Sequence, residues 1–86
     1  MRTIKVGLIG LGTVGGGVVD IFSKHREDFK HRAGVDVVLA AAADRNEARF
    51  AQLGLEPAIC TTDAFEVARN SSLDIVIELI GGTGVA

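Results

Sequence analysis

The apolar residues of this chain occur in short unbroken runs, and the segments between these runs have apolar residues at helical spacing. The runs Thr3–Ile9, Val35–Ala43 and Asp74–Ile80 have the length of strands and little polar alternation, and a smaller strand is expected at Ala58–Thr61. Strands that lack a regularly polar face are typical of parallel sheets, because helices cover both sides of such a sheet. We therefore expect four strands with connecting segments long enough to hold helices.

A long helix is expected after the first strand. Val14, Val18, Phe22 and Phe29 recur at spacings of four, four and seven residues, which places them on one face of a helix from Thr13 to about Arg32. Its second half is mostly charged and is expected to be solvated. Gly34 then suits a helix end, because glycine readily adopts the left-handed conformation found there.

Two shorter helices are expected later in the chain, over Asn46–Leu53 and Asp63–Arg69. Pro57 prevents the first from continuing, because proline lacks the backbone N–H that a helix needs. Asp63, followed three residues later by Glu66, forms a start signal of the capping-box type, and Thr62 is an alternative cap.

The resulting order βαβαβαβ predicts an α/β fold with a parallel sheet, since short parallel strands need crossover connections. Eighty-six residues allow a single small domain, so we treat residues 1–86 as one unit. A doubly wound nucleotide-binding sheet continues beyond its fourth strand. The chain is therefore expected to be an amino-terminal fragment, with the substrate and catalytic domain outside it.

Charge and composition argue against several classes of function and location. The net charge of −2 gives no general electrostatic reason to bind nucleic acid or an anionic membrane. No apolar run approaches the roughly 20 residues that span a bilayer, and the amino terminus lacks a signal-peptide pattern. One cysteine, Cys60, cannot form an internal disulfide, and we expect a cytoplasmic protein.

The turn after the first strand carries a G-x-G-x-x-G motif, formed by Gly10, Leu11, Gly12, Thr13, Val14 and Gly15. Because the motif lies between a strand and a helix, it predicts a Rossmann-type dinucleotide site. Gly10 is assigned to the tight turn, Gly12 to the close approach of a pyrophosphate, and Gly15 to the close crossing of helix and strand. The alternative is a turn that only packs closely. A triphosphate loop is disfavoured because no Lys-Ser/Thr pair follows the glycines.

Asp44 ends the second strand, where a carboxylate can accept hydrogen bonds from an adenosine ribose, and this position favours NAD. It lies 29 residues after Gly15 rather than the usual ~20, and the surplus matches the charged extension of the first helix. Asp44 could instead serve only a surface turn or cap the next helix. Arg45 could hold a 2′-phosphate, which keeps NADP open.

The remaining chemically active residues have simpler interpretations. His25 and His31 lie among charged residues of the first helix and form no metal-ligand pattern with Cys60, so no metal site is expected. Cys60 is expected to pack rather than react. Glu78 interrupts a strand expected to be buried, near its carboxyl end, and is equally open to a structural or a ligand-binding role.

The chain resembles homoserine dehydrogenase over all its residues. The resemblance rests on Ile4–Gly15 together with Asp74–Gly82, whose ending D-I-V-x-E-L-I-G-G is far more particular than the glycine turn alone, and Thr61-Thr62-Asp63 also fits. Members commonly carry Arg where this chain has Ala43, which weakens the case for NADP.

The resemblance implies hydride transfer between homoserine and aspartate semialdehyde with NAD or NADP, on the pathway to threonine and methionine. It implies that Gly10, Leu11, Gly12, Thr13, Val14 and Gly15 contact the pyrophosphate, Asp44 or Arg45 the ribose, and Gly81 and Gly82 the nicotinamide. The family's catalytic residues come from later segments, so no catalytic residue is expected here and the chain alone is expected to be inactive.

Two alternatives remain at this point. One is another semialdehyde or dipicolinate-type reductase, which shares the turn but should lack the E-L-I-G-G ending. The other is a non-catalytic nucleotide-sensing module. We also expect the chain to self-associate through Asp74–Ile80 or its adjoining face, because this strand would leave an open apolar edge. A homo-oligomer is expected for the protein.

Overall fold

The computed structural model describes residues 1–79 and contains a four-stranded parallel sheet in the order β3-β2-β1-β4. The elements in chain order are β1 (Arg2–Ile9), α1 (Thr13–Ala33), β2 (Val35–Ala43), α2 (Ala48–Gln52), the 3₁₀ turn η1 (Pro57–Ile59), β3 (Cys60–Thr61), α3 (Ala64–Ala68) and β4 (Ile75–Glu78). The prediction of an α/β fold with a Rossmann-type parallel sheet is confirmed.

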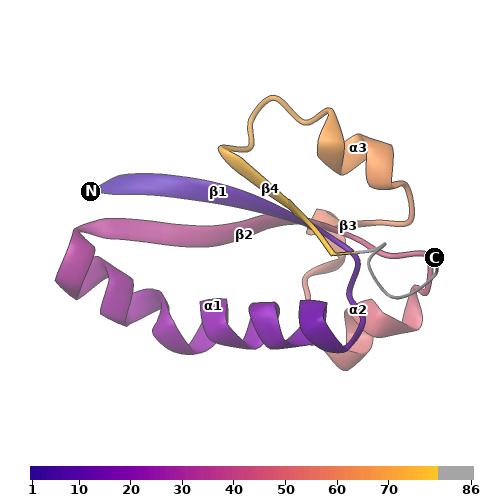
Figure 1. Ribbon diagram of the computed structural model, residues 1–86, viewed down its shortest axis with the longest axis horizontal. Helices are drawn as coiled ribbons and strands as arrows, with labels where there is room; N and C mark the ends of the chain where they lie inside the picture. Colours follow the sequence, from indigo (N-terminus) through magenta and orange to yellow (C-terminus); the bar gives the residue numbers. More distant parts are fainter. Residues whose placement is uncertain (80–86) are drawn as a thin grey trace.

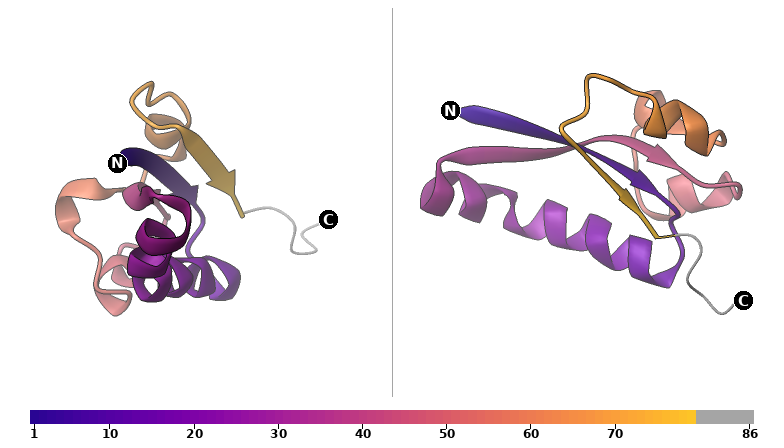
Figure 2. Two further views of the ribbon diagram at one scale, coloured as in Figure 1. Left: turned by 90° about the vertical axis from the view of Figure 1, so that its left-hand side faces the viewer. Right: turned by 45° about the horizontal axis from the view of Figure 1, so that its top comes forward.

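Helices cover both faces of this sheet. In Figure 1, α1 and α2 lie below the strands and α3 lies above them, and the turned views of Figure 2 show the same three layers. None of the described helices is both long and apolar enough to cross a bilayer.

The hydrophobic core is divided by the sheet into two clusters. On the side of α1, the buried residues are Leu8, Leu11, Val19 and Ala42. On the side of α3, they are Ile9, Ala41, Ala43 and Val67. Neighbouring residues of one strand point to opposite faces, so the carboxyl halves of β1 and β2 are buried on both sides. The core therefore lies directly beneath the turn that follows β1.

The long helix α1 ends at Gly34, whose φ of 68° is left-handed and whose amide bonds to the Lys30 carbonyl, as the sequence predicts. The predicted apolar face was wrong at one position, because Val14 is 65% exposed. The buried face runs through Gly15 and Val19 instead, since the helix crosses the turn closely at Gly15.

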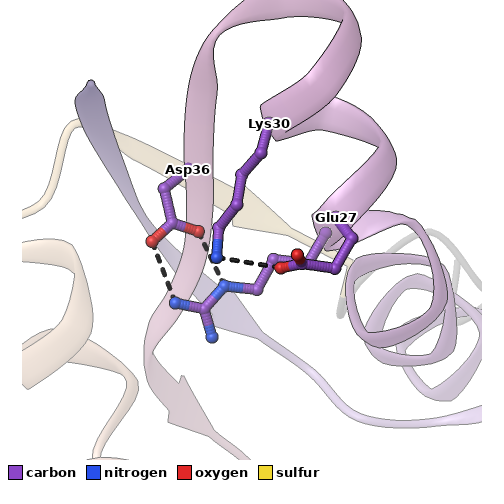
Figure 3. A network of polar contacts seen from close by, with 4 residues as sticks. Glu27, Lys30 and Asp36 are labelled. Carbon is purple, nitrogen blue, oxygen red and sulfur yellow. Dashed lines mark hydrogen bonds and ion pairs between the residues drawn. The ribbon is translucent and has the colours of Figure 1, made fainter.

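The second half of α1 carries surface ion pairs and one tie to the sheet. Arg26 donates two hydrogen bonds to Asp36 on β2, with distances of 2.6 and 2.9 Å, and Lys30 pairs with Glu27 at 2.9 Å (Figure 3). The hydrogen bond from Arg26 holds the pKa of Asp36 below its usual value, and Lys30 does the same for Glu27. This half of the helix is therefore mostly solvated, as expected.

Two short elements differ from the prediction. The expected strand Ala58–Thr61 is shortened to Cys60–Thr61, because Pro57 opens a 3₁₀ turn that is closed by a hydrogen bond from the Ile59 amide to the Glu56 carbonyl. The expected helix Asn46–Leu53 is shortened to α2, because the Asn46 side chain accepts the Ala48 amide before the helix begins.

The fourth strand is also shorter than predicted and more exposed. It lies at the edge of the sheet, and Ile75 and Val76 are 47% and 41% exposed. The expectation that Glu78 interrupts a buried strand was wrong, because its side chain is exposed at this edge. The expected open apolar edge is present in the described part of the chain.

Candidate functional site

The carboxyl ends of the strands remain joined after the strands end. The Gly10 amide donates to the Ala43 carbonyl at 2.8 Å, the Asp44 amide to the Thr61 carbonyl at 3.2 Å, and the Leu79 amide to the Ile9 carbonyl at 2.8 Å. The carboxyl ends of β1, β2 and β4 therefore lie side by side along one edge of the sheet (Figure 1). Ligands of doubly wound sheets bind at this edge.

Two glycines allow the turn after β1 to take its shape. Gly10 has a φ of 96°, a value that other residues rarely adopt. A Cβ on Gly15 would collide with the carbonyl oxygen of Gly10, so the first turn of α1 can lie against the end of β1 only without a side chain there. The geometry agrees with the tight turn and the close crossing that the motif predicts for these two positions.

Gly12 differs from both, because nothing lies within 4 Å of the position that its Cβ would occupy. It is the N-cap residue of α1, and no side chain caps the helix at this position. The first amides of a helix have no partner within the helix and carry the positive end of its dipole. The turn thus presents backbone donors beside open space, where a diphosphate group can approach.

Leu11 is held by Asp44. Its side chain is fully buried, and its amide donates to Oδ2 of Asp44 at 2.7 Å. The other carboxylate oxygen, Oδ1, accepts the Asn46 amide at 2.8 Å. The Leu11 amide is therefore already bonded, and Leu11 anchors the turn rather than offering a donor. Asp44 ties the two turns together while each of its oxygens retains further capacity to accept hydrogen bonds.

A residue that the sequence analysis missed, Arg49, holds the same turn from the other side. From α2, its Nε donates to the Leu11 carbonyl at 2.7 Å and its Nη2 to the Gly12 carbonyl at 3.4 Å. Its Nη1 donates to Gln52 at 2.8 Å, one turn along α2. The motif gives no signal for this residue, because its contacts depend on how α2 packs beside α1.

The other predicted site residues fall into three groups. Arg45 is exposed beside Asp44 and makes no hydrogen bond or ion pair within residues 1–79. Val14 is exposed in the first turn of α1, and Thr13 is the first residue of that helix. Gly81 and Gly82, expected near the nicotinamide, lie outside the described residues.

Cys60 lies near this edge but is not activated as a nucleophile. Partial burial raises the pKa of its thiol, and its Sγ contacts the Glu56 carbonyl at 3.3 Å. A thiol with a raised pKa is less reactive at neutral pH, because the thiolate is the nucleophile. His25 and His31 are exposed on α1.

The residues present therefore fit a dinucleotide at three points. A turn without a side chain at Gly12 can admit the diphosphate, the start of α1 supplies amide donors, and Asp44 can accept hydrogen bonds from ribose hydroxyls.

Comparison with known proteins identifies relatives of the whole chain. Residues 10–86 match the family described as "Homoserine dehydrogenase, NAD binding domain". The chain is 41% identical to homoserine dehydrogenases of Methylobacillus glycogenes and Pseudomonas aeruginosa over 86 residues, all of this chain, and it spans 21% and 19% of their lengths.

Solved structures give the same result. A homoserine dehydrogenase from Thiobacillus denitrificans superposes with a TM-score of 0.81 and 41% identity over 99% of this chain and 20% of that one. A homoserine dehydrogenase from S. aureus superposes with the same TM-score at 30% identity, covering 99% of this chain and 21% of that one. The chain thus spans about a fifth of the length of these relatives.

Proposed function

The chain belongs to the homoserine dehydrogenase NAD-binding domain family, and on that premise we propose that its turn Gly10–Gly15 holds the diphosphate of NAD or NADP. The observation that carries the proposal is the open space at Gly12 beside the start of α1. Backbone amides and the helix dipole can bind a diphosphate without a basic side chain, which suits a chain of net charge −2.

In this proposal the adenosine ribose lies against Asp44, and NAD is preferred. The carboxylate already accepts the Leu11 and Asn46 amides, which fixes its position, and it can accept ribose hydroxyls as well. A 2′-phosphate would be repelled by the same carboxylate. Arg45 is exposed beside Asp44 and is the residue that would hold the 2′-phosphate of NADP.

The whole protein would interconvert homoserine and aspartate semialdehyde, with NAD(P) accepting or donating the hydride. We expect its catalytic residues outside this chain, Gly81 and Gly82 beside the nicotinamide, a cytoplasmic location and a homo-oligomeric state. Residues 1–79 contribute the cofactor's diphosphate and ribose contacts, and this chain alone is expected to show no turnover.

Calorimetric titration of the chain with NAD and NADP in parallel tests the proposal. We expect both to bind, NAD more tightly. Absence of binding by both to a folded chain would contradict it. A second assay adds homoserine and NAD, and accumulation of NADH would show that the chain contains catalytic residues after all. We expect the chain to bind NAD without turnover. A non-catalytic nucleotide-sensing module would give the same result. Turnover of homoserine by a longer protein that contains this chain distinguishes the dehydrogenase from the sensing module.

A further inference from the structure

We propose that Arg49 is a positioning residue for the dinucleotide site: by holding the Leu11 and Gly12 carbonyls, it orients the Gly12 amide toward the diphosphate. This inference rests on the proposed function and extends it to a residue outside the glycine motif. The contacts are the charge-assisted hydrogen bonds from Nε to the Leu11 carbonyl and from Nη2 to the Gly12 carbonyl, at 2.7 and 3.4 Å.

The geometry of the peptide bond explains the effect. No cis peptide bond occurs in the described residues, so the carbonyl of Leu11 and the amide of Gly12, which share one peptide group, point in opposite directions. Arg49 binds the carbonyl, and the amide therefore points away from α2. The Arg49 side chain thereby orients the Gly12 amide without contacting it.

The peptide groups on either side are fixed by other partners. The Leu11 amide, which belongs to the preceding group, donates to Asp44. The Gly12 carbonyl, which belongs to the following group, accepts the Gly16 amide at 2.8 Å as the first bond of the helix. Arg49 is the partner of the Leu11 carbonyl in the part of the chain described, so the orientation of the peptide group between Leu11 and Gly12 depends on it.

The fit between Arg49 and α1 is close. A Cβ on Gly16 would lie 3.1 Å from Nη2 of Arg49, so the guanidinium packs against the first turn of the helix. Its Nη1 is held in turn by Gln52 at 2.8 Å. The planar guanidinium can contact two successive carbonyls and Gln52 together, whereas a lysine ammonium is a compact point charge.

The test compares Arg49→Gln with Arg32→Gln. Both remove one positive charge, but Arg32 is paired with Asp28 at the opposite end of α1. For Arg49→Gln we expect the Kd for NAD to rise about tenfold, the size of one lost charge-assisted hydrogen bond. The Kd for adenosine, which has no phosphate, should change less than twofold. Arg32→Gln should leave both values unchanged.

An NMR readout separates positioning from general stability. The amide signal of Gly12 should move in unliganded Arg49→Gln and stay in place in Arg32→Gln. An unchanged Kd for NAD, or equal weakening of NAD and adenosine, would overturn the proposal. If Arg49→Gln does not fold, Arg49→Lys decides: about threefold weaker NAD binding with a displaced Gly12 signal supports the proposal, and wild-type values contradict it.

The outcomes also separate this proposal from the proposed function. If the folded wild-type chain binds no NAD, the proposed function fails. The Gly12 signal of Arg49→Gln then still shows whether Arg49 orients the turn, and an unmoved signal overturns that role too.

Discussion

The carboxylate of Asp44 accepts the backbone amide of Leu11 at 2.7 Å, which joins the turn after β2 to the glycine-rich turn after β1 across 33 residues of sequence. Arg49 binds the carbonyl of the same residue. Leu11 therefore donates its amide hydrogen to an acidic side chain and accepts a hydrogen bond at its carbonyl from a basic one. The shape of the candidate site is therefore set by two side chains outside the motif.

Asp44→Ala should weaken both the fold and the binding of dinucleotide. The variant loses the hydrogen bonds to the Leu11 and Asn46 amides, and we expect the free energy of unfolding to fall by about 2 kcal/mol. Urea unfolding and NAD titration measure the two effects. The matched control is Asp63→Ala, which removes the α3 cap at the Phe65 amide and should cost about 1 kcal/mol with unchanged NAD affinity. Loss of stability in Asp44→Ala with wild-type NAD affinity would limit Asp44 to a structural role.

Gly15→Ala and Gly17→Ala should have opposite effects on stability. A Cβ at position 15 meets the Gly10 carbonyl, a backbone atom that cannot move aside, so we expect a loss of about 2 kcal/mol or more. Position 17 has no atom within 4 Å of a Cβ, and alanine there should add about 0.5–1 kcal/mol through helix propensity. Thermal unfolding of both variants checks this. A Gly15→Ala variant as stable as wild type would mean that α1 does not cross the turn this closely.

Acid should weaken the link between α1 and β2. The hydrogen bond from Arg26 lowers the pKa of Asp36 in the folded state, so the unfolded chain binds a proton more readily. The stabilisation is present above the ordinary carboxyl pKa and is lost as the pH falls through the lowered folded-state pKa. Asp36→Asn should reduce the Tm at neutral pH and flatten its decline in acid. If the Tm of Asp36→Asn and of wild type fell equally from neutral to acidic pH, the pair Arg26–Asp36 would contribute nothing to the pH dependence of stability.

Arg45→Ala should separate the two cofactors. Because Arg45 is exposed and makes no hydrogen bond or ion pair within residues 1–79, its removal should leave the Tm close to that of wild type and the Kd for NAD within twofold of it. Its guanidinium can pair with the extra 2′-phosphate of NADP, a group that NAD lacks, so the Kd for NADP should rise several-fold. Titration with both cofactors measures the ratio. Equal Kd changes for NAD and NADP would exclude Arg45 as a 2′-phosphate contact.

The sequence was sufficient to predict the features of the fold that depend on neighbouring residues. The βαβαβαβ order, the glycine end of α1 at Gly34 and the Asp63 cap are confirmed, because periodicity and local hydrogen bonding determine each of them. Pro57 also shortens β3, because the 3₁₀ turn that begins at this proline occupies the first residues of the expected strand.

Features that depend on packing were not predicted. Val14 has the spacing of a core residue but is exposed, because the close contact at Gly15 turns the buried face of α1 toward Val19. Arg49 resembles any charged residue of a short helix until α2 is placed beside the glycine turn. The contacts of Arg49 join segments 37 and 38 residues apart in sequence, and no local pattern encodes them.

The central claim is that the open space at Gly12 receives the diphosphate of a dinucleotide, and calorimetric titration of Gly12→Ala with NAD tests it most directly. Gly12 has a φ of −70° and nothing within 4 Å of its Cβ position, so alanine fits the fold and should cost about 1 kcal/mol or less as a poorer N-cap. We predict that this variant unfolds within a few degrees of wild type and binds NAD at least about tenfold more weakly, because the methyl group occupies the space of the diphosphate. Wild-type affinity for NAD in a folded Gly12→Ala chain would contradict the account.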